Sequence, residues 1–358
     1  NAERYYARAV FYQNFKKDYQ QALIDFSKVI QLDEENPSRW YNRAIFYYSH
    51  LKENQKALDD FAKTLEIDST YVNAINYRGL IFNSEGNYEK AIKEYERGIA
   101  LKEIDQEGAA YCYRNRATQY ERLREYDKAL ADYDSAIALE PENADRYASR
   151  ARFYYEYKKD YNKSIVDYTK ATELNGADAE NWRMLGYVYH YGIKDYEKAI
   201  KYYEKSLEAD STYVNSINSL ALIYVEQKKY DLAIKEYERG IALKEIDQEG
   251  AAYCYRNRAT QYERLREYDK ALADYDSAIA LEPENADRYN ARAIFYENYK
   301  KDYQQALIDY SKAIELDKEN PDVWYNRGNT YYKYLNDNQK ALDDFAKVLE
   351  LDSTYVNA

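Results

Sequence analysis

Few residues of this 358-residue chain have the types and spacing that catalysis or metal binding requires. The two histidines are His50 and His190, and neither has a second histidine at the spacing of metal ligands. The two cysteines, Cys112 and Cys254, occupy equivalent places in two copies of one segment, with no histidine beside them to act as a base. Glycine-rich phosphate-binding motifs are missing. We therefore expect unpaired, buried thiols, no metal or other cofactor, and no enzyme active site.

Neighbouring hydroxyl groups recur in the sequence Asp-Ser-Thr-Tyr, which begins at Asp68, Asp210 and Asp352. On an exposed turn such hydroxyls are candidates for O-glycosylation or phosphorylation. The alternative interpretation is that serine or threonine caps the helix that follows. The candidate modification sites are Ser69, Thr70, Tyr71, Ser211, Thr212, Tyr213, Ser353, Thr354 and Tyr355.

The charge balance limits the partners, because 52 basic residues stand against 64 acidic ones and the net charge is −12. Nucleic-acid binding needs a basic surface that releases counterions, so we expect no nucleic-acid partner despite local clusters of arginine. No apolar run approaches the roughly 18 residues that span a bilayer. The chain begins with Asn1, so it is a processed chain, a trimmed one or a window on a longer array. We expect an extracellular or cell-surface location, with cytoplasm or periplasm as the alternatives.

The chain repeats itself at two scales. Residues 91–147 recur unchanged as 233–289, and the same shift divides the chain into large repeats at 1–142 and 143–284 and a partial repeat at 285–358. Within each large repeat runs a shorter repeat, whose third step is the longest. Ten short repeats result, which align at Tyr5, Trp40, Ile75, Tyr113, Tyr147, Trp182, Ile217, Tyr255, Tyr289 and Trp324.

Each short repeat carries two amphipathic segments. In the first repeat, Ala9 follows the alignment position by four residues and Tyr12 comes three later, which is the spacing of one helix face. A second segment follows with Ala22 and, four residues on, Phe26. Small residues at these places let two helices approach closely. With only 10 Gly and 4 Pro in the chain, we expect helical hairpins with short connections.

The sixth repeat resembles the tetratricopeptide repeat family most clearly. Trp182-x2-Leu185-Gly186-x2-Tyr189, followed by Ala199-x3-Tyr203, matches that family's signature. The resemblance extends over all ten repeats, although arginine replaces the usual leucine in most of them. It implies one all-α domain over 1–358, a right-handed superhelical solenoid of antiparallel helix hairpins, with a concave groove lined by the first helices.

The arginines at the leucine position form one column, and acidic residues beside the second-helix aromatic form another. Arg8 and Asp25 represent the two columns in the first repeat. Where Leu185 replaces the arginine, Tyr202 replaces the acid, whereas Leu220 is accompanied by Glu236. We interpret the columns as ion pairs between the two helices of a hairpin, and a ladder for an anionic ligand is the alternative.

Tyrosine is unusually frequent, with 47 residues against 9 Phe and 3 Trp. Most tyrosines fall in aromatic columns of the repeats, but ten fall where the resemblance places the groove. Rigid amphipathic rings there suit binding of a peptide, protein or glycan, while the alternative is that the family tolerates tyrosine at these places. The ten are Tyr6, Tyr41, Tyr48, Tyr111, Tyr155, Tyr187, Tyr191, Tyr253, Tyr325 and Tyr332.

Two functions follow from these patterns. The unchanged copy of residues 91–147 and the lack of a polar capping helix at either end favour a structural solenoid that stacks on itself, head to tail, into a filament. We expect a charge at Val10 or Val356 to prevent this stacking. The alternative function is an adaptor that binds a peptide or protein in the tyrosine-rich groove.

Overall fold

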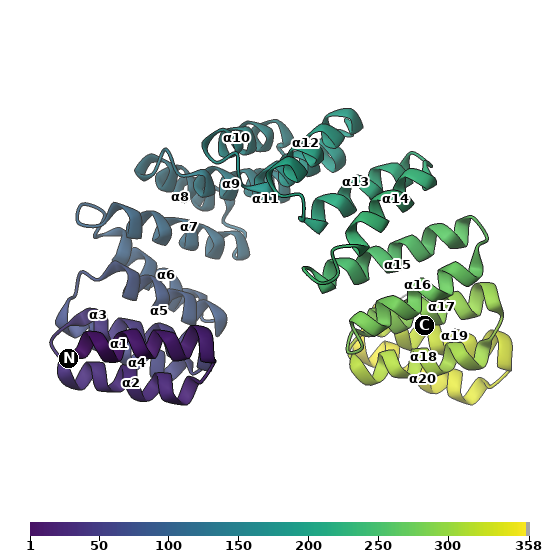
Figure 1. Ribbon diagram of the computed structural model, residues 1–358, viewed down its shortest axis with the longest axis horizontal. Coiled ribbons are helices and arrows are strands. Elements are labelled where there is room, and N and C mark those ends of the chain that lie inside the picture. Colours follow the sequence, from purple (N-terminus) through teal and green to yellow (C-terminus); the bar gives the residue numbers. More distant parts are fainter. Residues whose placement is uncertain (356–358) are drawn as a thin grey trace. The chain divides into compact units, whose positions relative to one another are not determined.

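The computed structural model describes residues 1–355, so Val356 lies outside it. These residues form twenty α-helices and six π-helical segments, without strands, which confirms the expected all-α fold. Contacts between residues divide the chain into a first unit, Asn1–Asn175, and a second unit, Gly176–Ala358. Within each unit, helix hairpins follow one another side by side (Figure 1).

The helices pair along the chain, one hairpin to each sequence repeat. In the first unit the hairpins are α1 (Ala2–Phe11) with α2 (Tyr19–Leu32), α3 (Pro37–Phe46) with α4 (Asn54–Ile67), α5 (Val72–Ser84) with α6 (Tyr88–Ile99), α7 (Gln106–Arg122) with α8 (Tyr126–Leu139), and α9 (Ala144–Phe153) with α10 (Tyr161–Leu174). In the second unit they are α11 (Ala179–Tyr187) with α12 (Tyr196–Ala209), α13 (Val214–Glu226) with α14 (Tyr230–Ile241), α15 (Gln248–Arg264) with α16 (Tyr268–Leu281), α17 (Ala286–Phe295) with α18 (Tyr303–Leu316), and α19 (Pro321–Thr330) with α20 (Asn338–Leu351).

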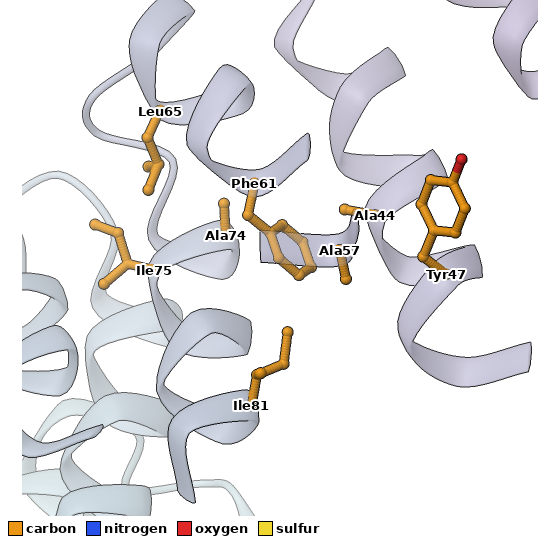
Figure 2. Close-up of a cluster of buried hydrophobic side chains, with 8 residues drawn as sticks. All are labelled: Ala44, Tyr47, Ala57, Phe61, Leu65, Ala74, Ile75 and Ile81. Carbon is orange, nitrogen blue, oxygen red and sulfur yellow. The ribbon is translucent and has the colours of Figure 1, made fainter. Parts of the chain in front are cut away.

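Small residues hold the two helices of each hairpin together, as the sequence predicts. Ala44 on α3 and Ala57 on α4 are fully buried, and the ring of Phe61 packs beside them (Figure 2). In the third repeat a Cβ atom on Gly79 would lie 2.4 Å from the ring of Tyr95, so no larger residue fits there. The hairpin core is therefore an aromatic ring packed against small side chains of both helices.

Six first helices end in a π-helical turn, and the sequence spacing explains which ones. The small residues of the two helices are one position further apart in those repeats, as from Ala9 to Ala22, than in the other four, as from Gly79 to Ala91. The extra residue is accommodated as a π-helical turn. These segments are η1 (Tyr12–Lys16), η2 (Tyr47–Leu51), η3 (Tyr154–Lys158), η4 (Val188–Ile193), η5 (Tyr296–Lys300) and η6 (Tyr331–Leu335).

The longest step between repeats has a different cause, a longer connection between hairpins. The chain from Ala91 to the next small residue, Ala117, is four residues longer than the equivalent stretch from Ala57 to Gly79. The additional residues form turns between α6 and α7, and they leave Ile104 two-thirds exposed.

The arginine and acidic columns form ion pairs within hairpins, as we interpreted them. In the second repeat, Nε of Arg43 donates to Oδ2 of Asp60 at 2.7 Å, and Nη2 donates to Oδ1 at 2.9 Å. The eight pairs are Arg8–Asp25, Arg43–Asp60, Arg78–Glu94, Arg116–Asp132, Arg150–Asp167, Arg258–Asp274, Arg292–Asp309 and Arg327–Asp344. The carboxylates are largely buried, so the arginines satisfy acids inside the hairpins.

Candidate functional site

The first helices of consecutive hairpins lie side by side within each unit and form a shared surface, which we call the first-helix face. It is formed by α1, α3, α5, α7 and α9 in the first unit and by α11, α13, α15, α17 and α19 in the second. On it, Nδ2 of Asn115 on α7 donates to Oδ1 of Asn76 on α5 at 2.7 Å. In the second unit, Nε2 of His190 on η4, which follows α11, lies 3.2 Å from the carboxylate of Glu226 on α13. Side chains from neighbouring repeats therefore meet on this face.

A pocket of ≈ 430 Å³ opens on the first-helix face of the second unit. Most of its wall comes from α11, α13 and the start of α15, with one residue from α17. Positions three or four residues apart on a helix share a face, which is why Asn215, Ser219 and Leu222 on α13 can line one wall together. The lining residues are Arg183, Asn215, Asn218, Ser219, Leu222, Asp247, Glu249, Gly250, Tyr253 and Arg288.

The cations of this pocket already have anionic partners. Nε and Nη2 of Arg183 each donate to Glu180 at 2.7 Å, and the hydroxyl of Tyr213 donates to the same carboxylate at 2.5 Å. Nε of Arg288 donates to Glu282 at 2.6 Å. The charges of both arginines are therefore compensated inside the protein.

Tyrosine rings lie at the equivalent place in the first unit. The shift that maps residues 91–147 onto 233–289 also maps Tyr41 onto Arg183 and Tyr77 onto Ser219. The rings of Tyr41 and Tyr77 contact each other with centroids 6.1 Å apart, and Tyr41 also packs against Tyr71 at 5.0 Å. Two substitutions from tyrosine to smaller or more polar residues thus accompany the pocket of the second unit.

A carboxylate, Glu226, follows the lining residue Leu222 by one helical turn on α13, and it lies beside His190. His190 is fully buried, its Nδ1 atom lies 3.3 Å from the hydroxyl of Tyr203, and its ring stacks on Tyr191 with centroids 3.9 Å apart. Burial lowers the pKa of His190, although Glu226 acts in the opposite direction. The hydroxyl of Tyr196 is hydrogen-bonded to Glu226 as well, and this raises the pKa of the tyrosine.

Six of the ten tyrosines expected in a groove contact side chains of their own hairpin or of the next one. The rings of Tyr6, Tyr41 and Tyr325 contact the second-helix aromatics Phe26, Phe61 and Phe345. Tyr48 contacts Tyr77, Tyr155 contacts Tyr161, and Tyr111 lies 4.1 Å from the guanidinium carbon of Arg146.

The remaining four candidates all belong to the second unit. Tyr187 and Tyr191 come together with ring centroids 4.6 Å apart. Tyr253 is 37% exposed in the pocket wall, and Tyr332 is 58% exposed on η6. The structure thus brings two of the ten, Tyr187 and Tyr191, into contact with each other, and it places Tyr253 in the pocket wall.

The Asp-Ser-Thr-Tyr turns are closed by their aspartate. Oδ1 of Asp68 accepts from the backbone N–H of Thr70 at 2.9 Å and from its hydroxyl at 2.7 Å. The copies at Thr212 and Thr354 repeat both bonds. The helix after the first turn has no side-chain cap, so the interpretation that serine or threonine caps it is wrong. Thr70 instead hydrogen-bonds backward to the aspartate.

The hydroxyls of these turns differ in accessibility. Ser69, Ser211 and Ser353 are exposed. The hydroxyl of Tyr213 donates to Glu180, and that of Tyr355 donates to Asp322 at 2.6 Å. Of the nine candidate residues, the three serines and Thr354 are exposed, and the hydroxyl of Thr354 donates to Asp352.

Both cysteines are buried free thiols, as expected. Burial raises the pKa of Cys112 and of Cys254 to about 12, so neither is a ready nucleophile. Residues 1–355 contain no group of His, Cys, Asp and Glu able to hold a metal ion. A search of the same residues finds no helix with the length and apolarity needed to cross a membrane.

Side-by-side helix hairpins with a shared first-helix face define a class of protein, the repeat scaffold for protein interactions. Models of the tetratricopeptide repeat match residues 74–105, 110–143, 179–213, 214–247, 252–285 and 321–355, and a TPR repeat model matches 297–334. Together the matches cover more than half of the chain. The chain belongs to the tetratricopeptide repeat family.

Individual relatives are distant. A stretch of 56 residues, 16% of this chain, is 36% identical to the DnaJ homolog subfamily C member 7 homolog of Schizosaccharomyces pombe, and it spans 12% of that protein. A tetratricopeptide repeat protein from Parabacteroides merdae has a TM-score of 0.51 at 19% identity, over 72% of this chain and 98% of that one. PilW, a type IV pilus biogenesis factor, has a TM-score of 0.50 at 17% identity, over 62% of this chain and 97% of PilW. These two likenesses concern the fold alone.

Proposed function

We propose that this scaffold binds an extended segment of a partner protein on the first-helix face of its second unit. One observation carries the proposal: a pocket of ≈ 430 Å³ lies between α11, α13 and α15, where the first unit has the contacting rings of Tyr41 and Tyr77. The contrast between two copies of nearly the same surface indicates that the second copy is the one shaped for a ligand.

The lining residues suit a peptide. Side-chain amides of Asn215 and Asn218 and the hydroxyl of Ser219 supply donors and acceptors for a peptide backbone. Leu222 and the ring of Tyr253 offer apolar area, and a tyrosine ring is ordered at low entropic cost. Polar groups that point into a site beside a small apolar wall fix the orientation of the bound peptide.

The test is to fill the pocket with the residue of the other copy. Peptides are first selected from a phage-displayed random library on the full chain, and their affinity is then measured by fluorescence anisotropy. We expect Ser219→Tyr to abolish binding, whereas the matched reverse change in the first unit, Tyr77→Ser, leaves it intact. Selected peptides that bind Ser219→Tyr as well as the original chain would contradict the proposal.

We propose head-to-tail assembly into a filament as a second function. It is supported by the unchanged copy of residues 91–147, within which Arg116–Asp132 and Arg258–Asp274 form the same ion pair at 2.7 Å. The face that one hairpin packs against the next within a chain also matches the same hairpin of a second chain. A heterologous contact of this kind gives an open filament when it does not close into a ring. Light scattering that grows with concentration, and that Val10→Lys abolishes, is the expected result. A chain that stays monomeric at high concentration excludes this function.

We also propose that the chain works outside the cell or at its surface and carries modified hydroxyls. The exposed serines Ser69, Ser211 and Ser353 support this, because they lie in the repeated turns. Intact mass spectrometry of native material should show a mass above that of the bare sequence. An unmodified mass counts against modification.

A further inference from the structure

We propose that the second unit seats one lysine or arginine side chain of its partner between Tyr187, Tyr191 and Tyr253, against the carboxylate of Glu226. This inference rests on the proposed peptide binding and names the chemistry of the bound segment. The occupant is a basic residue of a protein, and its charge is bound by tyrosine rings and one carboxylate.

Tyr187 on α11 and Tyr191 on η4 form a ring pair on one first helix, and Tyr253 lies on α15, two first helices further along. Tyr187 and Tyr191 are four residues apart and face the same side, with ring centroids 4.6 Å apart and an angle of 47° between the ring planes. Burial raises the pKa of Tyr191 to about 12, and Glu226, Tyr187 and Tyr253 act in the same direction. The ring faces are electron-rich, so they attract a cation placed over them.

Glu226 is the negative charge of the proposed site, and it has no permanently charged partner among the described residues. Within residues 1–355 the only basic group at ion-pair distance is His190, and burial lowers the pKa of that imidazole, which disfavours its charged form. The side chain of Glu226 is 36% exposed, so an incoming ammonium or guanidinium group has access to it.

The adjoining pocket adds to the negative charge. Its arginines are already paired with Glu180 and Glu282, whereas its carboxylates Asp247 and Glu249 form no ion pair among the described residues. A net charge of −12 on the whole chain also favours the approach of a basic segment.

One residue of the protein already occupies part of the proposed place. The ammonium group of Lys194, an exposed side chain, lies 5.4 Å from the centroid of Tyr191. The ring of Tyr191 thus already contacts one cation of the protein, and among the described residues Lys194 forms no ion pair with Glu226. A ligand cation would compete with Lys194, so removal of this lysine should strengthen binding.

The first unit supplies an internal comparison. The residues equivalent to Tyr187, Tyr191 and Glu226 are Ile45, Ser49 and Ser84. Only Tyr253 has its counterpart, Tyr111, which lies over Arg146 of the protein itself. The chemistry proposed here is therefore specific to the second copy.

The experiment starts from the library-selected peptides and asks whether they share a basic residue. We expect one lysine or arginine at a fixed position, and about a tenfold loss of affinity when that residue becomes glutamine. Glu226→Gln should cause a similar loss, and the two losses should not add, because each removes the same contact. Lys194→Ala should raise the affinity.

Controls separate this site from general electrostatics and from misfolding. Glu208→Gln removes the same charge from the exposed surface of α12 and should leave affinity unchanged. Far-ultraviolet circular dichroism checks that each variant keeps its helices. Selected peptides without a shared basic residue, or full binding by Glu226→Gln, overturn the inference. If those peptides still fail to bind Ser219→Tyr, the proposed function stands, whereas a library that yields no binder at all refutes both.

Discussion

At the scale of single residues, the ion pairs use the first-helix position at which the sixth and seventh repeats have Leu185 and Leu220. A guanidinium that donates two bonds to one buried carboxylate is satisfied in a way that a lone acid is not. The sixth repeat returns to Leu185 and places Tyr202 between Trp182 and Tyr189, at 6.1 Å and 5.3 Å between centroids. The seventh repeat keeps Glu236 without an arginine from its first helix, and burial raises the pKa of that carboxyl group.

The first prediction concerns the pair of Arg43 and Asp60. Arg43→Leu should lower the free energy of unfolding by about 3 kcal/mol, because it leaves Asp60 charged and buried. The double variant Arg43→Leu with Asp60→Leu should lower it less. Urea unfolding of the single and double variants measures both effects. A double variant that costs the sum of the single changes would exclude an interaction between the two residues.

The second prediction concerns pH. Burial lowers the pKa of His190 below its unfolded value of about 6.5, so the unfolded chain binds more protons in the interval between the two values. Stability should therefore fall as the pH drops from about 7 through this interval. His190→Gln should flatten the dependence, measured as the unfolding midpoint in urea at a series of pH values.

His50 provides the control for that measurement. Its pKa is also lowered by burial, but its side chain is more accessible than that of the fully buried His190. His50→Gln should change the pH dependence less than His190→Gln does. An equal effect of the two substitutions would show that His190 has no special part in it.

At the scale of helices, the π-helical turns allow the same hairpin to form with first helices of two different lengths. The left-handed residue that ends the first helix lies eight residues after Ala44 in the second repeat, at Lys52, but seven after Gly79 in the third, at Gly86. From each of these residues to the next small residue the distance is the same. The added residue is thus confined to the last turn of the first helix.

The third prediction tests this explanation by deletion. Removing Ser49 from η2 should convert the second repeat to the shorter spacing and change the free energy of unfolding by no more than about 1 kcal/mol. Removing Asn83 from α5 leaves a spacing that no repeat of this chain has, and the loss should be larger. Circular dichroism during urea unfolding compares the two. Equal losses would contradict the explanation.

The sequence predicts the hairpins, the small residues and the ion pairs because each depends on spacing within one repeat. The sequence also indicates the π-helical turns, because six repeats have one extra residue between the small residues of their two helices. This extra residue is visible only when the first and second helices of the repeats are aligned separately. The pocket has no such signal. Tyr41 can lie on its own hairpin or reach into a groove with the same spacing, and only the packing against Phe61 and Tyr71 decides between them.

At the scale of the whole molecule, the two copies are conserved and divergent in different places. Residues 91–147 are unchanged in the second copy, yet on the face of α3 and α5 the equivalent positions change from Tyr41 to Arg183 and from Tyr77 to Ser219. A surface kept uniform for a lattice does not require such differences, whereas a ligand site present in one copy does. The divergence therefore supports the scaffold more than the filament.

The last prediction transfers the site from the second copy to the first. Most of the pocket is already present there, because Asn73, Asn76, Leu80 and Tyr111 correspond to Asn215, Asn218, Leu222 and Tyr253. The missing features require six substitutions, which are Ser38→Glu, Tyr41→Arg, Ile45→Tyr, Ser49→Tyr, Tyr77→Ser and Ser84→Glu.

The grafted chain should bind two equivalents of a selected peptide by isothermal titration calorimetry, where the original chain binds one. Adding Ser219→Tyr to the grafted chain should return the stoichiometry to one, since it closes the original pocket alone. In the original chain the rings of Tyr41 and Tyr77 lie where the pocket would form in the first unit, so replacing these two residues makes room for the peptide. A grafted chain that keeps its helices and still binds one peptide would show that these six positions do not define the site.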